Sequence, residues 1–174
     1  MKKADLLDRK ILKVISVDAR RSFKEIAAHC GVSRAAIHQR VVRMFERGII
    51  TGSGYQVNPK YLGFGTCSFI GIKLERGNMY HSVVQELQKI PEVVECHFTT
   101  GAYGMIVKLY SQDNEHLKEL LTNRIQEIAG VNGTDTMISL EQSIQRNIPI
   151  TLDGEEDEDM DEPVRISLTD EADD

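Results

Sequence analysis

The chain has 174 residues, 41% of them hydrophobic and 28% charged, which suits one domain or two small ones and excludes a large multidomain enzyme. Because no apolar run approaches the ~18 residues that cross a bilayer and no signal peptide begins the chain, we expect a cytoplasmic protein without a membrane partner. The net charge of −6 is the sum of +7 over residues 1–50, −2 over residues 51–150 and −11 over residues 151–174. This asymmetry suggests a nucleic-acid partner for the basic segment.

The basic segment begins with two helical patterns. Apolar residues recur at spacings of three and four over residues 6–15, and Asp5 can cap the start of this helix. Ser22 and Glu25 have the spacing of a capping box, in which the hydroxyl and the carboxylate each accept a backbone N–H of the other residue. They predict a second, short helix that ends at Gly31, where glycine can adopt the left-handed conformation.

A third helix follows after a three-residue turn. Ser33 can cap it, and its apolar face carries Ile37, Val41 and Met44 before Gly48 stops it. A short helix, a glycine turn and a second helix that starts with Ser are typical of a helix-turn-helix. We therefore predict a DNA-binding domain in residues 1–55.

Two short β-prone pieces surround Gly52-Ser53-Gly54 and predict a hairpin over residues 49–57. This hairpin would make the first domain winged-helix-like. Residues 56–65 are predicted to form the hairpin end and the linker.

The body of the chain alternates between strand and helix patterns. Strands are predicted at 66–74, 93–99, 105–110 and 134–140, and helices at 78–90 and 113–129. The order βαββαβ is that of a ferredoxin-like domain, which we place at residues 66–152, so the whole chain belongs to the α+β class. Both helices would cover one face of the sheet and leave the other bare, so we expect self-association.

Residues 153–174 contain one basic and twelve acidic residues. They offer too little apolar surface to offset the entropy of ordering, so we predict an acidic disordered tail. Two interpretations stay open. The tail either competes with DNA for the basic segment or serves only as a solubilising appendage.

Several motifs occur in the order and spacing of a known family. They are Asp8-Arg9-Lys10-Ile11-Leu12, Ile26-Ala27-Ala28-His29-Cys30-Gly31-Val32-Ser33, Arg40-Val41 and Gly48-Ile49-Ile50, then Thr100-Gly101-Ala102-Tyr103-Gly104 and Thr134-Asp135-Thr136. Over residues 5–150 the chain resembles the Lrp/AsnC, or feast/famine, transcription regulators. The resemblance implies homodimers that assemble further, with an octamer expected, and an amino-acid effector held between dimers. Phe45 and Gly104 depart from the family, which usually has a polar or acidic residue at the first position and Asp at the second.

In a helix-turn-helix, the amino-terminal part of the second helix meets base edges, while basic side chains around it hold phosphates. The predicted DNA-binding residues are Lys24, Ser33, Arg34, Ala35, His38, Gln39, Arg40 and Arg43. Arg34 can pair with guanine, Gln39 with adenine, and Ala35 can contact a thymine methyl group. Phosphate contacts are expected from Lys24, Arg40 and Arg43, with Arg21 and Arg47. For any one arginine, the alternative is a solvated helix face.

The loop at residues 100–104 is the second candidate site. Glycine allows close backbone approach, so amides near Gly101 can receive a carboxylate. The resemblance implies an effector that contacts Gly101, Tyr103, Gly104, Thr134 and Thr136. An ordinary hairpin turn would also satisfy this sequence.

Nothing in the sequence indicates an enzyme. No nucleophile, glycine-rich phosphate loop or histidine partner accompanies the acidic pairs, and the histidines and the three cysteines lack metal-ligand spacing, so we expect no catalytic residue, metal or cofactor. The sequence predicts a sequence-specific DNA-binding transcription regulator modulated by an amino-acid-like molecule. The alternatives are a low-specificity chromosome-organising protein without an effector, and a small-molecule sensor that acts through protein partners.

Overall fold

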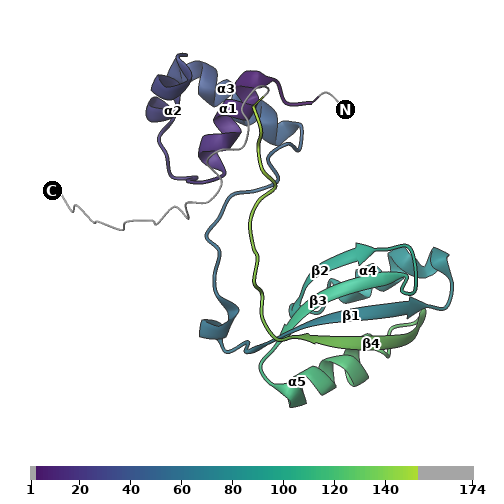
Figure 1. The fold of residues 1–174 in the computed structure, drawn as a ribbon. Coiled ribbons are helices and arrows are strands. Elements are labelled where there is room, and N and C mark those ends of the chain that lie inside the picture. The colour runs from purple at the N-terminus through teal and green to yellow at the C-terminus, as the bar shows by residue number, and fades with distance from the viewer. Residues whose placement is uncertain (1–2, 153–174) are drawn as a thin grey trace. The chain divides into compact units, whose positions relative to one another are not determined.

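The computed structural model describes residues 3–152, which divide into two compact units (Figure 1). Residues 3–55 group with residues 146–152, and residues 56–145 form the second unit. The second unit therefore begins and ends earlier in the chain than the range of 66–152 that the sequence suggested, because residues 146–152 group with the first unit. The acidic tail that we predicted to be disordered lies outside the described residues. No helix of the described chain is long and apolar enough to span a membrane.

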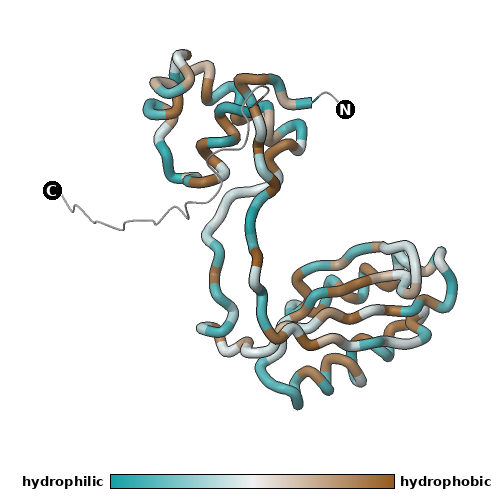
Figure 2. Tube along the Cα trace, viewed as in Figure 1, coloured by the Kyte–Doolittle hydropathy of each residue, from teal (hydrophilic) through white to brown (hydrophobic). Residues whose placement is uncertain are grey.

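The first unit consists of three helices: α1 (Leu6–Ile15), α2 (Phe23–Cys30) and α3 (Arg34–Glu46). Each helix starts at the predicted capping residue, and the boxes at Asp5 and Ser22 are both complete. One core joins the three helices, with buried side chains from Ile11, Ile26, Ala27, Ile37, Val41 and Met44. Hydrophobic positions therefore recur along these helices, with polar positions between them (Figure 2).

The turn between α2 and α3 has the geometry that the sequence required. Gly31 ends α2 with φ of 67°, a left-handed conformation that other residues adopt only with strain. Ser33 then accepts the N–H of Ala36 and starts α3. The predicted helix-turn-helix is therefore confirmed.

The predicted hairpin over residues 49–57 is wrong, because no strand forms there. The N–H groups of Ile49 and Ile50 donate to the carbonyl oxygen of Met44, at 2.9 and 3.2 Å, and both side chains pack on the three-helix core. These two residues thus complete the end of α3 and are not available as a strand. Residues 51–58 are exposed, and the linker contains one short 3₁₀ turn at Pro59–Leu62.

The second unit has a four-stranded antiparallel sheet, in the order β2-β3-β1-β4. The strands are β1 (Thr66–Leu74), β2 (Val93–Phe98), β3 (Met105–Ser111) and β4 (Val131–Ser139). After β1, a 3₁₀ turn (Gly77–Met79) leads into α4 (Tyr80–Leu87), and α5 (Asn114–Glu119) lies between β3 and β4. The predicted ferredoxin-like βαββαβ order is confirmed.

The second predicted helix of this unit is not uniform. It changes after α5 into a π-helix at Leu120–Ile125. In an α-helix, positions five residues apart point about 140° away from each other, whereas a π-helix, with i→i+5 bonds, brings them closer to one face. The wider turn therefore allows Leu120 and Ile125 to be buried together.

The two faces of the sheet differ. Side chains that alternate along β1 and β3, such as Ile70, Ile72, Val107 and Leu109, form a core with the helices. The opposite face carries Phe69, Ile106, Tyr110 and Met137, as the strand register requires. No helix of this unit covers that face (Figure 1).

Candidate nucleic-acid interface and ligand loop

The first half of α3 presents one exposed face. Arg34, Ala35, His38 and Gln39 are exposed there, whereas Ile37 points into the core. Each of the four exposed positions lies one, three or four residues from at least two of the others, so together they form a contiguous surface over the first turns of a helix capped at Ser33. Four of the predicted DNA-binding residues are thus together on the part of a helix that can enter a major groove.

His38 contacts α2 through a ring interaction that the sequence did not reveal. Its imidazole lies edge-on to Phe23, with ring centroids 5.8 Å apart and planes at 73°. This contact restrains the His38 side chain next to Gln39. The Ser33 hydroxyl is used in the helix cap, where it accepts the Ala36 N–H at 3.2 Å.

The basic residues fall into two groups. Lys24, Arg34 and Arg43 are exposed and form no ion pair with another described residue. Arg40 is different, because its Nη1 contacts the carboxylates of both Asp5 and Asp8, the latter at 2.8 Å. Its guanidinium therefore links α3 to the first turn of α1.

This link affects the ionisation of its partners. Hydrogen bonding by the Arg40 guanidinium is the main cause that lowers the pKa of Asp5 below its usual value. The same carboxylates raise the pKa of Arg40 further. The Asp8 side chain is only 7% exposed, so its negative charge depends on Arg40 for compensation. The half-buried Arg40 side chain is thus paired within the first unit.

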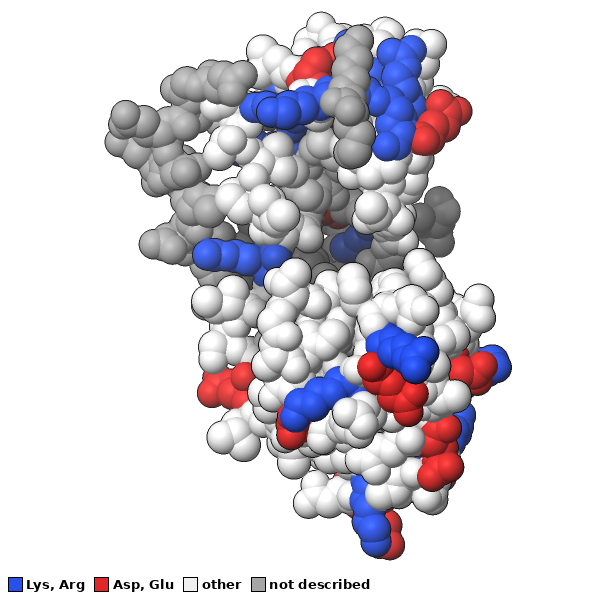
Figure 3. Space-filling view, turned by 90° about the vertical axis from the view of Figure 1, so that its right-hand side faces the viewer, with Lys and Arg blue, Asp and Glu red and all other residues white. Residues whose placement is uncertain are grey.

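On the face of the first unit that Figure 3 shows, blue Lys and Arg side chains cover more of the surface than red Asp and Glu side chains. Part of its negative charge is neutralised internally, by Arg40 as described and by Arg21, which lies 3.7 Å from Asp18. Glu25 is held by Ser22, whose hydroxyl is 2.7 Å away and is the main cause of a lowered pKa for Glu25. The exposed basic residues therefore dominate the local potential.

The loop between β2 and β3 is fixed by its own hydrogen bonds. The Thr99 hydroxyl donates to the Tyr103 carbonyl oxygen at 2.8 Å, and the Thr99 N–H donates to the Gly104 carbonyl oxygen at 3.0 Å. Gly101 lies at the exposed tip, with φ of 113°. These contacts are those of an ordinary tight connection, and they leave the tip open to solvent.

Tyr103 lies on the sheet face that the helices do not cover. Its ring covers Gly71 so closely that a Cβ built at Gly71 would be 2.7 Å from the ring. Lys73 Nζ lies 5.7 Å from the ring centroid and 2.8 Å from the Asp135 carboxylate. This ion pair, with a hydrogen bond from Tyr103 as a minor cause, lowers the pKa of Asp135.

The predicted effector residues do not all meet within one subunit. Thr134 and Thr136 pair with Ile72 and Ile70, so their side chains lie on the helix-covered side of β4, and the Thr134 hydroxyl accepts a bond from Gln126. Tyr103 lies on the opposite, uncovered face, Gly101 lies at the loop tip, and a Cβ at Gly104 would contact Leu74, which packs with the helix-side core. Asp135, which lies between the two threonines and pairs with Gly71, is the residue of this strand segment that faces Tyr103.

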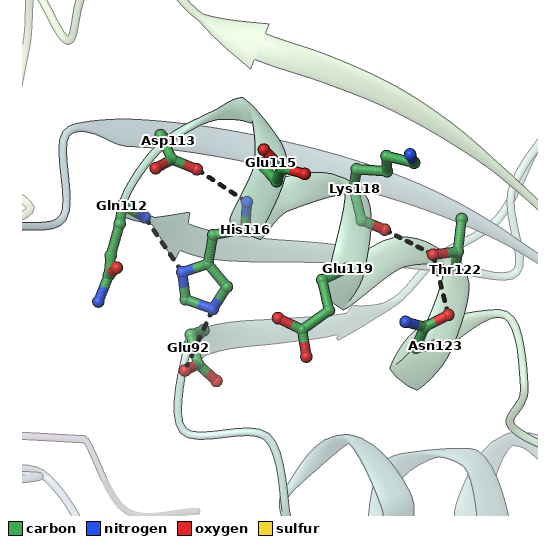
Figure 4. A pocket seen from close by; sticks show the side chains of 9 residues that line it. All are labelled: Glu92, Gln112, Asp113, Glu115, His116, Lys118, Glu119, Thr122 and Asn123. Atoms are coloured by element: carbon green, nitrogen blue, oxygen red, sulfur yellow. Dashed lines mark hydrogen bonds and ion pairs between the residues drawn. The ribbon is translucent and has the colours of Figure 1, made fainter.

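A separate hollow of about 740 Å³ lies beside α5, away from every predicted site residue (Figure 4). It is lined by Glu92, Gln112, Asp113, Glu115, His116, Lys118, Glu119, Thr122 and Asn123. His116 Nδ1 accepts the Gln112 N–H at 3.3 Å, and its Nε2 lies 3.8 Å from Glu92. Among the described residues, no group of three or more His, Cys, Asp and Glu side chains has the arrangement of a metal site.

Comparison with known proteins identifies both units. Residues 5–44 match the AsnC-type helix-turn-helix domain, and residues 67–149 match the Lrp/AsnC ligand binding domain. The chain is 38% identical over 148 residues to the regulatory protein AsnC of Haemophilus influenzae, covering 85% of this chain and 99% of that protein. The structure of Escherichia coli AsnC is 39% identical, with a TM-score of 0.78 and coverage of 84% and 99%. A feast or famine regulatory protein of Mycobacterium tuberculosis, in complex with L-methionine, is 26% identical, with a TM-score of 0.78 and coverage of 86% and 100%.

Proposed function

The chain belongs to the Lrp/AsnC family of DNA-binding transcription regulators, and from this premise we propose how its residues recognise DNA and an effector. The observation that carries the DNA proposal is the exposed face of α3. Arg34 and Gln39 read base edges in the major groove, and Ala35 contacts a thymine methyl group. Lys24 and Arg43 hold phosphates.

Arg40 is not part of this interface. A phosphate contact would require its guanidinium to leave Asp5 and Asp8, and Asp8 would then keep a buried charge without its partner. Arg40 therefore positions α3 against α1, and His38, restrained by Phe23, borders the base-reading face.

The test starts by selecting bound fragments from random DNA to obtain the best site. Arg34→Ala and Gln39→Ala should each cost ~1–3 kcal/mol on that site and relax base preference there. Arg43→Ala, a matched control on the same helix, should weaken binding to all sequences about equally. If a dimer neutralises roughly six to eight phosphates, log affinity should fall against log salt with a slope of about −5 to −7. Equal losses on selected and random DNA for Arg34→Ala and Gln39→Ala would refute base reading and favour the chromosome-organising alternative.

The second unit binds an amino-acid-like effector at the loop of residues 100–104. The support is the family membership and the relative that was solved with L-methionine. Backbone amides near Gly101 receive the carboxylate, but Gly104 offers no carboxylate for the ammonium group. Asp135 is the nearby acid, and its charge is already paired with Lys73. We therefore expect ordinary amino acids to bind weakly.

Gly104→Asp tests this expectation by calorimetry against the twenty amino acids. A Cβ at this position would lie 3.1 Å from Leu74, so Gly104→Ala is the matched control that adds the same contact without a carboxylate. A charge-assisted hydrogen bond is worth roughly 1.5–3 kcal/mol, which predicts about ten- to a hundredfold tighter binding for Gly104→Asp than for Gly104→Ala. Micromolar binding by the parent protein, without a gain in Gly104→Asp, would contradict the role of position 104.

The uncovered sheet face supports self-association. Phe69, Ile106, Tyr110 and Met137 give it an apolar centre, and a homodimer formed through this face would then assemble to a higher oligomer, with an octamer expected. Sedimentation measures the assembly directly. Ile106→Glu should dissociate it, whereas a parent protein that sediments as a monomer at micromolar concentration would overturn this part of the proposal.

A further inference from the structure

We propose that the acidic tail, residues 153–174, docks on the basic surface of the DNA-binding unit in its own chain and competes there with DNA. This inference rests on the DNA-binding function proposed above. It assigns a partner to the exposed basic residues of α1, α2 and α3 when DNA is absent.

The structure brings the start of the tail to the first unit. The Asn147 side-chain amide donates to the Ser16 carbonyl oxygen at 3.3 Å, and Arg9 Nη1 donates to the Thr151 carbonyl oxygen at 3.3 Å. Ile150 and Leu152 are half-buried. The described chain therefore ends beside α1, and the first acidic residue of the tail, Asp153, follows the contact with Arg9 by two positions.

The charges of the two partners are complementary. Residues 1–50 hold twelve Lys and Arg against five Asp and Glu, whereas the tail holds twelve acidic residues and one Arg. Four of those five acids are held by Arg40, Arg21 or Ser22, as described above. The exposed cations, among them Lys10, Lys24, Arg34 and Arg43, thus form a surface that attracts a polyanion, whether DNA or the tail.

The tail is long enough to reach any face of the first unit. Its 22 residues span up to about 70 Å when extended. A compact unit of this size has a radius of gyration of about 10 Å. Because residues 146–152 fix the starting point on the first unit itself, the local concentration of tail carboxylates is of millimolar order.

The tail lies beyond the residues that the two family models match. The family models end at residue 149, and the relative from Haemophilus influenzae is 99% covered by 85% of this chain. The uncovered face of α3 is needed for DNA, so a competing polyanion on the same chain regulates the function without changing the base-reading residues. Since carboxylates occupy phosphate positions, competition should weaken all DNA sequences by a similar factor.

The experiment uses the full-length protein with eight tail carboxylates converted to amides. The changes are Asp153→Asn, Glu155→Gln, Glu156→Gln, Asp157→Asn, Glu158→Gln, Asp159→Asn, Asp161→Asn and Glu162→Gln. The matched control is a full-length chain whose residues 153–174 are shuffled, which keeps length and charge. Fluorescence anisotropy gives the affinity for random DNA at about 50 mM and about 300 mM salt, where the Debye length falls from roughly 14 to 6 Å.

The amide variant should bind random and selected DNA about five- to tenfold more tightly than the parent at low salt, with the difference lost at high salt. Its salt slope should also be steeper, by about 0.9 for each phosphate-sized contact that the tail no longer fills. The shuffled chain should behave like the parent. An amide variant that matches the parent at low salt would overturn the proposal.

A second measurement does not depend on DNA binding. Carbodiimide cross-linking followed by peptide mass spectrometry should join tail carboxylates to Lys10, Lys13 or Lys24 at low salt, and selected DNA should reduce these products. Asn147→Ala, which removes the anchoring bond to Ser16, should lower their yield. Absence of cross-links to the first unit would overturn the docking. If the parent protein bound no DNA at any salt while the cross-links formed, the proposed function would fail and the docking would stand.

Discussion

Replacing Arg40 by Ala should destabilise the first unit while leaving the DNA contacts in place. The change leaves Asp8, whose side chain is 7% exposed, without the cation that now contacts it at 2.8 Å. Removing one partner of a fully buried ion pair costs about 3–5 kcal/mol. Asp8 keeps the Asp5 N–H at 3.2 Å, and Asp5 is 56% exposed, so the expected loss of unfolding free energy is smaller, about 2–3 kcal/mol.

Urea titration followed by far-ultraviolet circular dichroism measures this loss, because the first unit is helical and the chain has no Trp to serve as a fluorescent probe. Arg43→Ala is the matched control on the same helix, and it should change stability by less than about 0.5 kcal/mol. In the Arg40→Ala background, Asp8→Asn removes the uncompensated charge and should recover roughly 1 kcal/mol or more.

In DNA binding, Arg43→Ala should have the larger effect, whereas in stability Arg40→Ala has the larger effect. Under conditions in which both variants are folded, Arg43→Ala should reduce the salt slope of the dimer by about 1.8, or about 0.9 for each subunit, while Arg40→Ala should leave it unchanged. The reasoning would be refuted if Arg40→Ala were as stable as Arg43→Ala, or if it reduced the slope by the same amount.

Three further predictions concern caps, packing and pH. Ser22→Ala removes the cap of α2 and should lower the unfolding free energy by about 1 kcal/mol in the same titration, whereas Ser22→Thr should retain most of it. Gly71→Ala forces the Tyr103 ring from its place and should lower the unfolding free energy by about 1–3 kcal/mol. Unchanged NMR chemical shifts of the Tyr103 ring protons would contradict this prediction. Because Arg40 lowers the pKa of Asp5, this carboxyl stabilises the fold above its unfolded pKa of ~3.9, and the stabilisation disappears as the pH falls through the lower folded value. Asp5→Asn should therefore flatten the acid dependence of stability below about pH 4, and an unaltered dependence would exclude this contribution.

Local signals in the sequence account for the elements that were predicted correctly. Asp5, Ser22 and Ser33 mark helix starts because a cap is formed by residues three positions apart, and Gly31 marks a turn because of its own backbone. The predicted hairpin is wrong because a non-local contact, which no local signal indicates, decides the structure there. Ile49 and Ile50 are β-prone, but their packing on the helical core prevails over that preference, and only the tertiary structure shows this core.

In the candidate sites, too, the features set by local sequence could be predicted and those set by distant residues could not. The exposed face of α3 follows from helical periodicity, so Arg34 and Gln39 could be located from the sequence. The role of Arg40 could not, because Asp5 and Asp8 precede it by 35 and 32 positions and nothing local links them. On β4, the register with β1 decides which residues face the ligand loop, and a strand pattern alone does not fix that register.

The return of residues 146–152 to the first unit has a consequence for protein synthesis. The three helices are complete when Glu46 has been made, but the contacts of Asn147 with Ser16 and of Thr151 with Arg9 require the last part of the described chain. At about 5–20 residues per second, the ribosome adds this part several seconds after the helices, and only after the whole sheet of the second unit. A nascent or prematurely terminated chain therefore presents its DNA-binding helices before residues 146–152 arrive, so the full set of contacts in the first unit requires that the second unit has already been synthesised.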